Sequence, residues 1–343
     1  MHTRPGCLIA VVGPSGAGKD SLLNGAREQL PQVHFMRRII TRAHNAGGWC
    51  AAANGWLATP AAFTAEVMAH CGWDSVTVDM QHGLIDYQVA VSQFQAISTT
   101  DVVPMVRVPW LDAGLIMKVL DAGAYGVICP MINNGEDARL FAHYASYPPL
   151  GTRSFGPVRA SIYGGADYTD KANDEIIRMA MVETKEGLEK VDEIVNTDGI
   201  DAIYVGPNDL ANALGQRPML DTENEVVLRA FEKIIKACRS AGKPVGLHNG
   251  SAPYAVRMIE MGFQLVTVQS DAGILKNAAS SIVAEIKGGV AKLDLLEPGL
   301  MAVARVDVAD GVRVGGQAIR HAVGALRLGR ARGPHGRRDR ARG

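Results

Sequence analysis

Short apolar runs rich in Val, Ile and Ala alternate with amphipathic stretches from residue 47 to residue 289. This alternation is typical of βα units on a parallel sheet. Eight units over about 240 residues match the usual size of a (β/α)8 barrel, so we predict an α/β fold of the TIM-barrel type. The expected strands are residues 48–57, 75–79, 103–108, 126–130, 177–182, 202–205, 245–248 and 265–268.

The stretches between these runs have the spacing of amphipathic helices. Several are followed by a glycine that can take the left-handed conformation at a helix C-terminus, namely Gly72, Gly123, Gly242 and Gly262. The next expected strand begins within a few residues of each. The expected helices are residues 61–70, 88–96, 113–122, 136–145, 185–195, 223–241 and 252–261.

The composition is ordinary for a globular enzyme, with 47% hydrophobic and 20% charged residues in a chain of 343. The formal net charge is +0, so no global field favours nucleic acid or a membrane surface. No apolar stretch approaches the length of a membrane span. The five scattered cysteines lack the spacing of a zinc site, and we expect reduced thiols in a cytoplasmic protein.

Ionisable side chains collect at the ends of the expected strands. Barrel enzymes carry their reactive groups on the loops at the C-terminal ends of the strands, so we expect the active site there. The alternative is that strand ends turn polar only because the chain reaches solvent. The side chains concerned are Asp79, His82, Arg107, Glu183, Asp209 and His248.

Glu183 and Asp209 follow successive strands, so their carboxylates can converge on one divalent cation such as Mg²⁺, Mn²⁺ or Co²⁺. Such an ion can chelate a 2-oxo acid and polarise its ketone, giving a metal-bound enolate. Arg107 can hold the enolate oxygen, and the loop Gly206-Pro207-Asn208-Asp209 offers backbone N–H groups to a substrate carboxylate. His82 can act as the acid–base group.

Five motifs occur together in this order along the chain: VDMQHG at 78–83, VRVPW at 106–110, YPPLGTR at 147–153, VET at 182–184 and GPNDL at 206–210. With them, residues 47–289 resemble the HpcH/HpaI aldolase family of metal-dependent pyruvate aldolases, which includes 4-hydroxy-2-oxoheptanedioate aldolase. The resemblance implies a TIM barrel of the phosphoenolpyruvate/pyruvate type. It also implies reversible cleavage of a 4-hydroxy-2-oxo acid to pyruvate and an aldehyde.

The resemblance implies roles for single residues as well. Glu183 and Asp209 would bind the metal, Arg107 would contact the oxo group, and His82 would be the base. Asp121 would pair with the His82 of a neighbouring subunit, so a homo-oligomer, trimeric or hexameric, is implied.

Two other lyase mechanisms compete with this interpretation. A Schiff-base aldolase needs a lysine on a barrel strand, and none of the eight expected strands contains one. A citrate-lyase-like enzyme acting on a CoA thioester should need a larger basic pocket. A non-catalytic alternative is a fused remnant whose barrel no longer folds or assembles.

Residues 1–46 differ in character from the rest. Gly13, Gly18 and Lys19 have the spacing of a P-loop, with Asp20 in place of the usual Ser or Thr. Residues 8–42 resemble the start of ribose 1,5-bisphosphate phosphokinase, which suggests a truncated β-α-β kinase fragment. A P-loop kinase of a phosphorylated ribose is therefore a rival function, and nucleotide binding through Lys19 would distinguish it.

Residues 290–343 form a tail rich in Ala, Gly and Arg, with no lysine after residue 305. We expect this tail to be disordered. Its arginines suit phosphate backbones, but an incidental origin of the composition is favoured over nucleic-acid binding.

Overall fold

The computed structural model describes residues 51–294. Up to Ser281 the described residues belong to one compact unit, and a second unit begins at Ile282. The predicted P-loop segment lies outside the described residues, as does the tail beyond residue 294. Both expectations therefore stay predictions.

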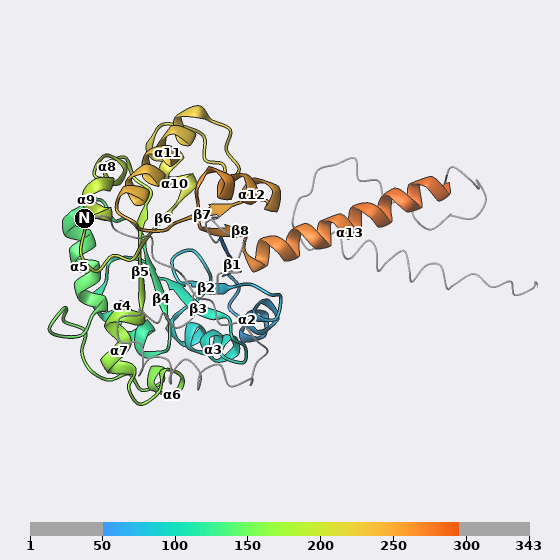
Figure 1. The fold of residues 1–343 in the computed structure, drawn as a ribbon. Coiled ribbons are helices and arrows are strands. Elements are labelled where there is room, and N and C mark those ends of the chain that lie inside the picture. Colours follow the sequence, from blue (N-terminus) through green and yellow to red (C-terminus); the bar gives the residue numbers. More distant parts are fainter. Residues whose placement is uncertain (1–50, 295–343) are drawn as a thin grey trace, which may run out of the picture. The chain divides into compact units, whose positions relative to one another are not determined.

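Eight parallel strands form a closed barrel in which each strand pairs with the next and β8 pairs with β1. Figure 1 shows helices around the outside of these strands. The predicted TIM barrel is confirmed. The strands are β1 (Ala52–Leu57), β2 (Ser75–Asp79), β3 (Val103–Arg107), β4 (Gly126–Cys129), β5 (Ile177–Val182), β6 (Ala202–Val205), β7 (Val245–Asn249) and β8 (Leu265–Val268).

Capping side chains mark the start of several helices, and glycines mark the end of several. Asp86, Asp112 and Ser251 each cap a helix by accepting a hydrogen bond from a backbone N–H of its first turn. The four glycines predicted to end helices, at 72, 123, 242 and 262, all have positive φ angles. The helices are α2 (Ala62–Ala69), α3 (Tyr87–Ile97), α4 (Ala113–Asp121), α5 (Gly135–Ala145), α6 (Ala160–Gly164), α7 (Tyr168–Glu175), α8 (Lys185–Glu189), α9 (Val191–Val195), α10 (Pro207–Ala213), α11 (Glu225–Ser240), α12 (Ala252–Met261) and α13 (Asp271–Asp294).

Four of these helices were not predicted. The helices α6 and α10 are too short, at five and seven residues, to show a helical period, and α7 is mostly polar. In α13 apolar side chains such as Leu275 and Ile286 are exposed, so no buried stripe marks the helix. Because α13 continues to Asp294, residues 290–294 of the predicted disordered tail are helical.

Apolar side chains fill both faces of the barrel wall. Val78, Val106 and Leu247 belong to the outer core between strands and helices, whereas Met105 and Met179 belong to a second cluster inside the barrel. The inner cluster is Trp56, Val103, Met105, Ile128, Met179, Met181, Ala202 and Tyr204.

Part of the barrel interior is polar, although barrels of this type usually fill it with branched apolar side chains. Asn54 Nδ2 donates to Thr267 Oγ1 at 2.9 Å. The hydroxyls of Ser75 and Thr77 donate to Asn54 Oδ1 at 2.8 and 3.0 Å, and Tyr204 Oη donates to Thr267 Oγ1 at 2.8 Å. These buried polar groups satisfy one another, which offsets the cost of removing them from water.

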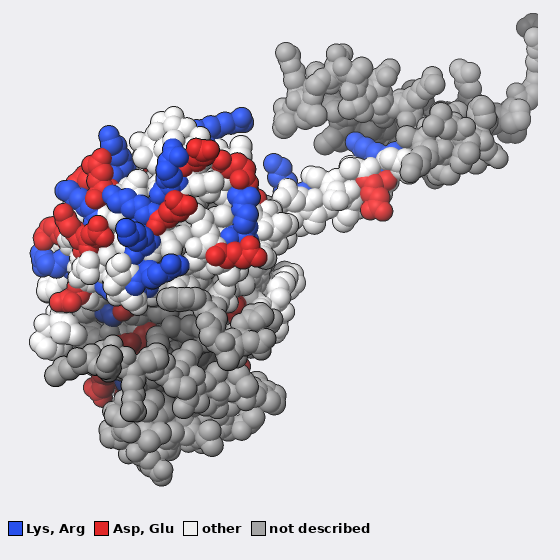
Figure 2. Space-filling model, turned by 45° about the horizontal axis from the view of Figure 1, so that its top comes forward, with Lys and Arg blue, Asp and Glu red and all other residues white. Residues whose placement is uncertain are grey.

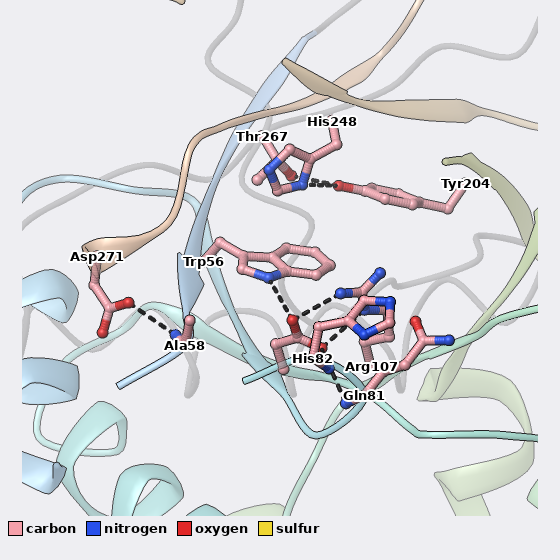
Figure 3. A network of polar contacts seen from close by, with 10 residues as sticks. Trp56, Ala58, Gln81, His82, Arg107, Tyr204, His248, Thr267 and Asp271 are labelled. Atoms are coloured by element: carbon pink, nitrogen blue, oxygen red, sulfur yellow. Dashed lines mark hydrogen bonds and ion pairs between the residues drawn. The ribbon is translucent and has the colours of Figure 1, made fainter. Parts of the chain in front are cut away.

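Asp271 ties the last strand of the barrel to the first. It follows β8, and its carboxylate accepts hydrogen bonds from the backbone N–H groups of Ala58 and Thr59 at 2.8 and 3.3 Å. The Thr59 hydroxyl donates to the same carboxylate. Figure 3 shows the contact with Ala58. Asp271 thereby fixes the loop that leaves β1.

Candidate active site

Asp79 and Arg107 form a buried ion pair at the C-terminal ends of β2 and β3, where the parallel register places them side by side. Arg107 Nε donates to Asp79 Oδ1 at 2.9 Å and Nη2 donates to Oδ2 at 2.7 Å. This two-point contact fixes the plane of the guanidinium. Arg107 also lies over the Trp56 ring, 4.8 Å from its centroid.

Three further donors complete the surroundings of Asp79. The Trp56 indole donates to Oδ2 at 3.2 Å, and the backbone N–H groups of Gln81 and His82 donate to Oδ1 at 3.0 and 3.3 Å (Figure 3). Burial raises the pKa of Asp79, but the hydrogen bonds and charge of Arg107, together with the other donors, outweigh burial and lower it below its usual value. Asp79 is therefore a charged anchor for Arg107.

His82 lies in the loop after β2, with an exposed side chain and a backbone N–H bound to Asp79. The loop turns tightly at Gly83, where an added Cβ would lie 2.2 Å from the Asp79 carbonyl oxygen. A glycine is required there, so the turn that carries His82 is built into the sequence.

Glu183 directly follows β5 and is only 2% exposed. Its Oε1 accepts a hydrogen bond from the Met131 N–H at 2.9 Å. Met131 has a φ of 58°, an unfavourable value for a side chain of its size, so the backbone is held in a strained conformation to make this contact. An added Cβ on Gly206 would lie 2.4 Å from Glu183 Oε2, so only glycine fits beside this oxygen.

Asp209 lies in the first turn of α10 and is exposed, while Gly206 and Pro207 are buried beneath it. Burial raises the pKa of Glu183 to about 7, and the negative charge of Asp209 adds to the rise. The buried Glu183 carboxylate and the exposed Asp209 carboxylate beside it have the negative charge and the hard oxygen donors that suit a divalent cation. The residues present therefore fit a metal ion.

Within the described residues, no group of three or more His, Cys, Asp and Glu side chains is placed to bind a metal. The candidate protein ligands are thus the two carboxylates of Glu183 and Asp209. Two side-chain ligands leave coordination positions for a substrate and water.

The segment Gly206-Pro207-Asn208-Asp209, expected as a loop, is the cap and first turn of α10. Pro207 has no N–H, so the predicted row of backbone donors is shorter than expected. Donors from Asn208 and Asp209 belong to the first helical turn, whose N–H groups have no helical carbonyl partner.

Asp121 ends α4, and its Oδ1 accepts a hydrogen bond from Arg153 Nη2 at 2.7 Å. The Arg153 side chain is 0% exposed and also contacts the rings of Tyr147 and Tyr168. Burial raises the pKa of Asp121, and the charge of Arg153 lowers it less. Within the chain, Asp121 is paired with Arg153 and is not brought to His82, so a pairing with His82 requires another subunit.

Sequence reasoning gave no role to Trp56, Tyr204 or His248. Trp56 lies next to Arg107, and Tyr204 and His248 lie against the other side of Trp56 (Figure 3). Trp56 contacts both Arg107 and His248. The position of Trp56 near the end of the first expected strand could have indicated a place at the active-site end of the barrel. His248 was predicted only as a polar residue at the end of the seventh expected strand.

The described strands contain no lysine, as the sequence predicted. Lys185, at the start of α8, has a 70% exposed side chain and lies near Glu189. No described strand therefore provides the buried amine that a Schiff base requires.

A family model described as HpcH/HpaI aldolase/citrate lyase matches residues 54–278. This chain belongs to the HpcH/HpaI aldolase family. The resemblance read from the motifs is thus confirmed. Members of the family that are similar to the chain include a hydroxypyruvate/pyruvate aldolase from Rhizorhabdus wittichii, 40% identical over 233 residues that cover 68% of this chain and 93% of the relative.

Two further HpcH/HpaI relatives support the same assignment. A 4-hydroxy-2-oxo-heptane-1,7-dioate aldolase from Klebsiella pneumoniae is 33% identical over 232 residues, which cover 67% of this chain and 87% of the relative. A solved structure of a family protein from Burkholderia cenocepacia has a TM-score of 0.66 and 31% identity, covering 69% of this chain and 95% of that one. The chain is accordingly a carbon–carbon lyase of the pyruvate aldolase family, which confirms the predicted enzyme class.

The charge distribution on the surface of this HpcH/HpaI member and the apolar character of its helices both bear on the expectations from composition. Basic and acidic side chains are interspersed on the face shown in Figure 2. None of the helices in the described part of the chain has the length and apolar character of a membrane span.

Proposed function

We propose that the chain is a divalent-metal-dependent aldolase that reversibly cleaves a 4-hydroxy-2-oxo acid to pyruvate and an aldehyde. The observation that carries this proposal is the buried Glu183 carboxylate beside Asp209, at the same end of the barrel as the Asp79–Arg107 pair. One end of the barrel thus holds two acidic oxygens for a cation and one guanidinium for an anion.

Glu183 and Asp209 would hold the ion, which we propose to be Mg²⁺, Mn²⁺ or Co²⁺. When bound, the ion would act as a Lewis acid on the 2-oxo group of the substrate. The strained Met131 N–H keeps Glu183 Oε1 in place, and Gly206 leaves room for Oε2.

Arg107 would bind the 2-oxo oxygen and the negative charge that develops on it. Asp79 engages Nε and Nη2 of Arg107, which leaves Nη1 as the nitrogen not used in the ion pair. A guanidinium fixed in this way needs no reorganisation when charge develops on the substrate.

His82 would take the proton of the C4 hydroxyl as the bond between C3 and C4 breaks. C4 then leaves as the aldehyde carbon, and the electron pair of the broken bond passes to C3 and the 2-oxo oxygen, where Arg107 faces it. A proton returned to C3 completes pyruvate. In the reverse direction His82 gives the proton back to the new hydroxyl.

We propose that Asp121 of a neighbouring copy orients His82 in a trimer or hexamer. Two observations support this. Asp121 keeps part of its carboxylate exposed at the end of α4, with 20% of its side chain accessible. Large apolar side chains are also exposed, including Leu84 at 77%, Phe155 at 76% and Val158 at 83%, and such surface is common at subunit interfaces.

The decisive experiment measures pyruvate release from 4-hydroxy-2-oxo acids with a lactate dehydrogenase coupled assay, before and after complete metal removal. We expect release that stops with a chelator and returns when Mg²⁺ or Mn²⁺ is added in excess. Release that survives complete metal removal would contradict the proposed mechanism.

A further inference from the structure

The loop between β4 and α5 holds Met131 in the left-handed conformation on which its contact with Glu183 depends. Two peptide planes flank Met131, and their orientations set its φ and ψ angles. The plane before Met131 carries its N–H, which donates to Glu183 Oε1 at 2.9 Å. The plane after it carries the Met131 carbonyl, which accepts a hydrogen bond from Asn133 Nδ2 at 2.9 Å. Both planes are therefore held by side chains, at a φ of 58°.

The Asn133 amide is itself fixed at both ends. Its Nδ2 is the group that faces Met131, since a carbonyl oxygen can only accept a hydrogen bond. Its Oδ1 accepts a hydrogen bond from the Thr184 hydroxyl, and that hydroxyl accepts one from the Gly187 N–H at 2.9 Å. A side-chain amide supplies the donor and the acceptor that these two contacts need.

These contacts form a closed ring, because Thr184 directly follows Glu183 in the chain. From the Glu183 carboxylate the ring passes through Met131 to Asn133. From Asn133 it returns through the Thr184 hydroxyl to the backbone beside Glu183. The Asn133 N–H adds an anchor by donating to Asp137 Oδ2 at 3.0 Å, in the first turn of α5. Removal of the Asn133 side chain would open the ring at the contact that holds the Met131 carbonyl.

We infer that Asn133 is a positioning residue that acts on the carboxylate of Glu183 through the backbone of Met131. This inference rests on the proposed metal-dependent function, in which Glu183 and Asp209 hold the ion. Without the Asn133 amide, Met131 should relax to a negative φ, because a positive φ is unfavourable for a side chain of its size. Its N–H then turns away from Glu183, and the carboxylate loses the contact that orients it for the ion.

The test measures Mn²⁺ affinity by electron paramagnetic resonance in the absence of substrate, so the result does not depend on turnover. Asn133→Ala removes both hydrogen bonds of the amide and should weaken Mn²⁺ binding about 10-fold. The matched control is Asn134→Ala. The Asn134 side chain caps α5 by accepting from the Asp137 N–H at 2.9 Å, so its loss should leave Mn²⁺ affinity unchanged.

Met131→Gly provides the rescue. Glycine takes positive φ angles as readily as negative ones, so its backbone needs no side chain to hold it there. Asn133→Ala should therefore weaken Mn²⁺ binding much less in the Met131→Gly background than in the wild-type background, and a double-mutant cycle measures this coupling. Thermal melts of the metal-free variants check that each one folds. Asn133→Leu, which keeps the volume of the side chain, takes the place of an Asn133→Ala variant that does not fold.

The two failures are distinguishable. Absence of Mn²⁺ binding in wild type would overturn the proposed metal site and this inference with it. Wild-type binding together with unchanged affinity in Asn133→Ala would overturn the inference alone. Equal losses in Asn133→Ala and Asn134→Ala, or equal losses in both backgrounds, would also overturn it, because the loop would then act through its general stability. A loss confined to Asn133→Ala and relieved by Met131→Gly supports it.

Discussion

Two buried carboxylates lie at the same end of the barrel, and their surroundings differ. Asp79, at the end of β2, receives five hydrogen bonds from Arg107, Trp56 and two backbone N–H groups, and its pKa is lowered. Glu183, after β5, receives a hydrogen bond from Met131, has Asp209 as a negatively charged neighbour, and its pKa is raised to about 7.

This difference indicates that Asp79 positions Arg107, whereas Glu183 is suited to binding a cation. A buried carboxylate surrounded by donors is stable as an anion and can hold a neighbouring cation rigidly. A buried carboxylate beside another carboxylate is stable only when it is protonated or when a cation is bound. Asp79 therefore has its counter-ion and hydrogen-bond donors within the described chain, whereas Glu183 has no cationic partner there that balances its charge.

The largest expected effect is the loss of turnover in Glu183→Gln. Removal of one acidic ligand should lower kcat/KM for pyruvate release by about 1000-fold or more, because the Lewis acid is worth several kcal/mol in the transition state. The coupled assay should show the loss of pyruvate release, and calorimetry should show the loss of metal binding in the same variant. The matched control is Glu186→Gln, an exposed glutamate paired with Lys190, which should retain activity. Equal losses in both variants would contradict the assignment.

Asp79→Asn should destabilise the fold by about 3 kcal/mol at pH 7, because it leaves the Arg107 charge buried without a counter-ion. The folded pKa of Asp79 is lowered, so its contribution in wild type is present above the ordinary value of 3.8 and is lost as pH falls through the folded pKa. Urea denaturation should show a gap between wild type and variant that is constant from pH 7 to 5 and narrows below about 4.

The comparison variant for Asp79 is Asp201→Asn. Asp201 also pairs with a buried arginine, Arg178, but 39% of its own side chain is accessible. Its loss should cost about 1 kcal/mol or less. A cost for Asp79→Asn no larger than that for Asp201→Asn would show that burial of both partners adds nothing to the Asp79–Arg107 pair.

Gly206→Ala should lower metal affinity by about 10-fold to 100-fold, since the added methyl group displaces Glu183 Oε2. Titration of Mn²⁺ followed by electron paramagnetic resonance measures this directly. Gly156→Ala is the control, because an added Cβ there meets nothing within 4 Å. Unchanged Mn²⁺ affinity in Gly206→Ala would show that Oε2 is not a ligand.

In metal-free protein, Glu183→Gln should be more stable than wild type by about 1–3 kcal/mol at pH 8 and equally stable at pH 4. The folded pKa of about 7 exceeds the ordinary 4.5, so wild type loses stability as pH rises through that window. Thermal melts of both proteins in chelator at several pH values test the sign of this stability difference. Excess Mg²⁺ should reverse the order at pH 8, because only wild type can bind it.

The smallest expected effect is that of Lys19→Ala, which should leave pyruvate release unchanged. Lys19 lies outside the described residues and outside the matched family region, 54–278. The coupled assay, with ATP binding measured in parallel, checks this. Nucleotide binding that disappears in the variant would support the rival kinase activity instead.

Much of the barrel could be predicted because each strand is a short β-prone run, and four of the helices that precede strands end near a glycine with a positive φ angle. The expected bounds of β2, β5, β6 and β8 agree with the structure residue for residue. The strand ends likewise indicated Glu183, Asp209 and Arg107 as candidates, because the direction of a parallel strand fixes the face to which its end belongs.

The contacts that give these residues their properties were not predictable. Trp56 and Asp79 are 23 positions apart, and Asp79 and Arg107 are 28 apart, so no local period relates their side chains. The pairing depends on strand register and on the inward direction of each side chain, which only the closed barrel determines. The polar network from Asn54 to Tyr204 was missed for the same reason.

The carboxylate of Asp271 has a consequence for synthesis of the chain. It binds Ala58, which precedes it by 213 positions, and β1 pairs with β8 just before it. At about 5–20 residues per second, β1 leaves the ribosome roughly 10 to 40 s before the residues that cover its free edge. During that interval the first strand of the barrel is an unpaired edge, open to chaperones or to the wrong partner.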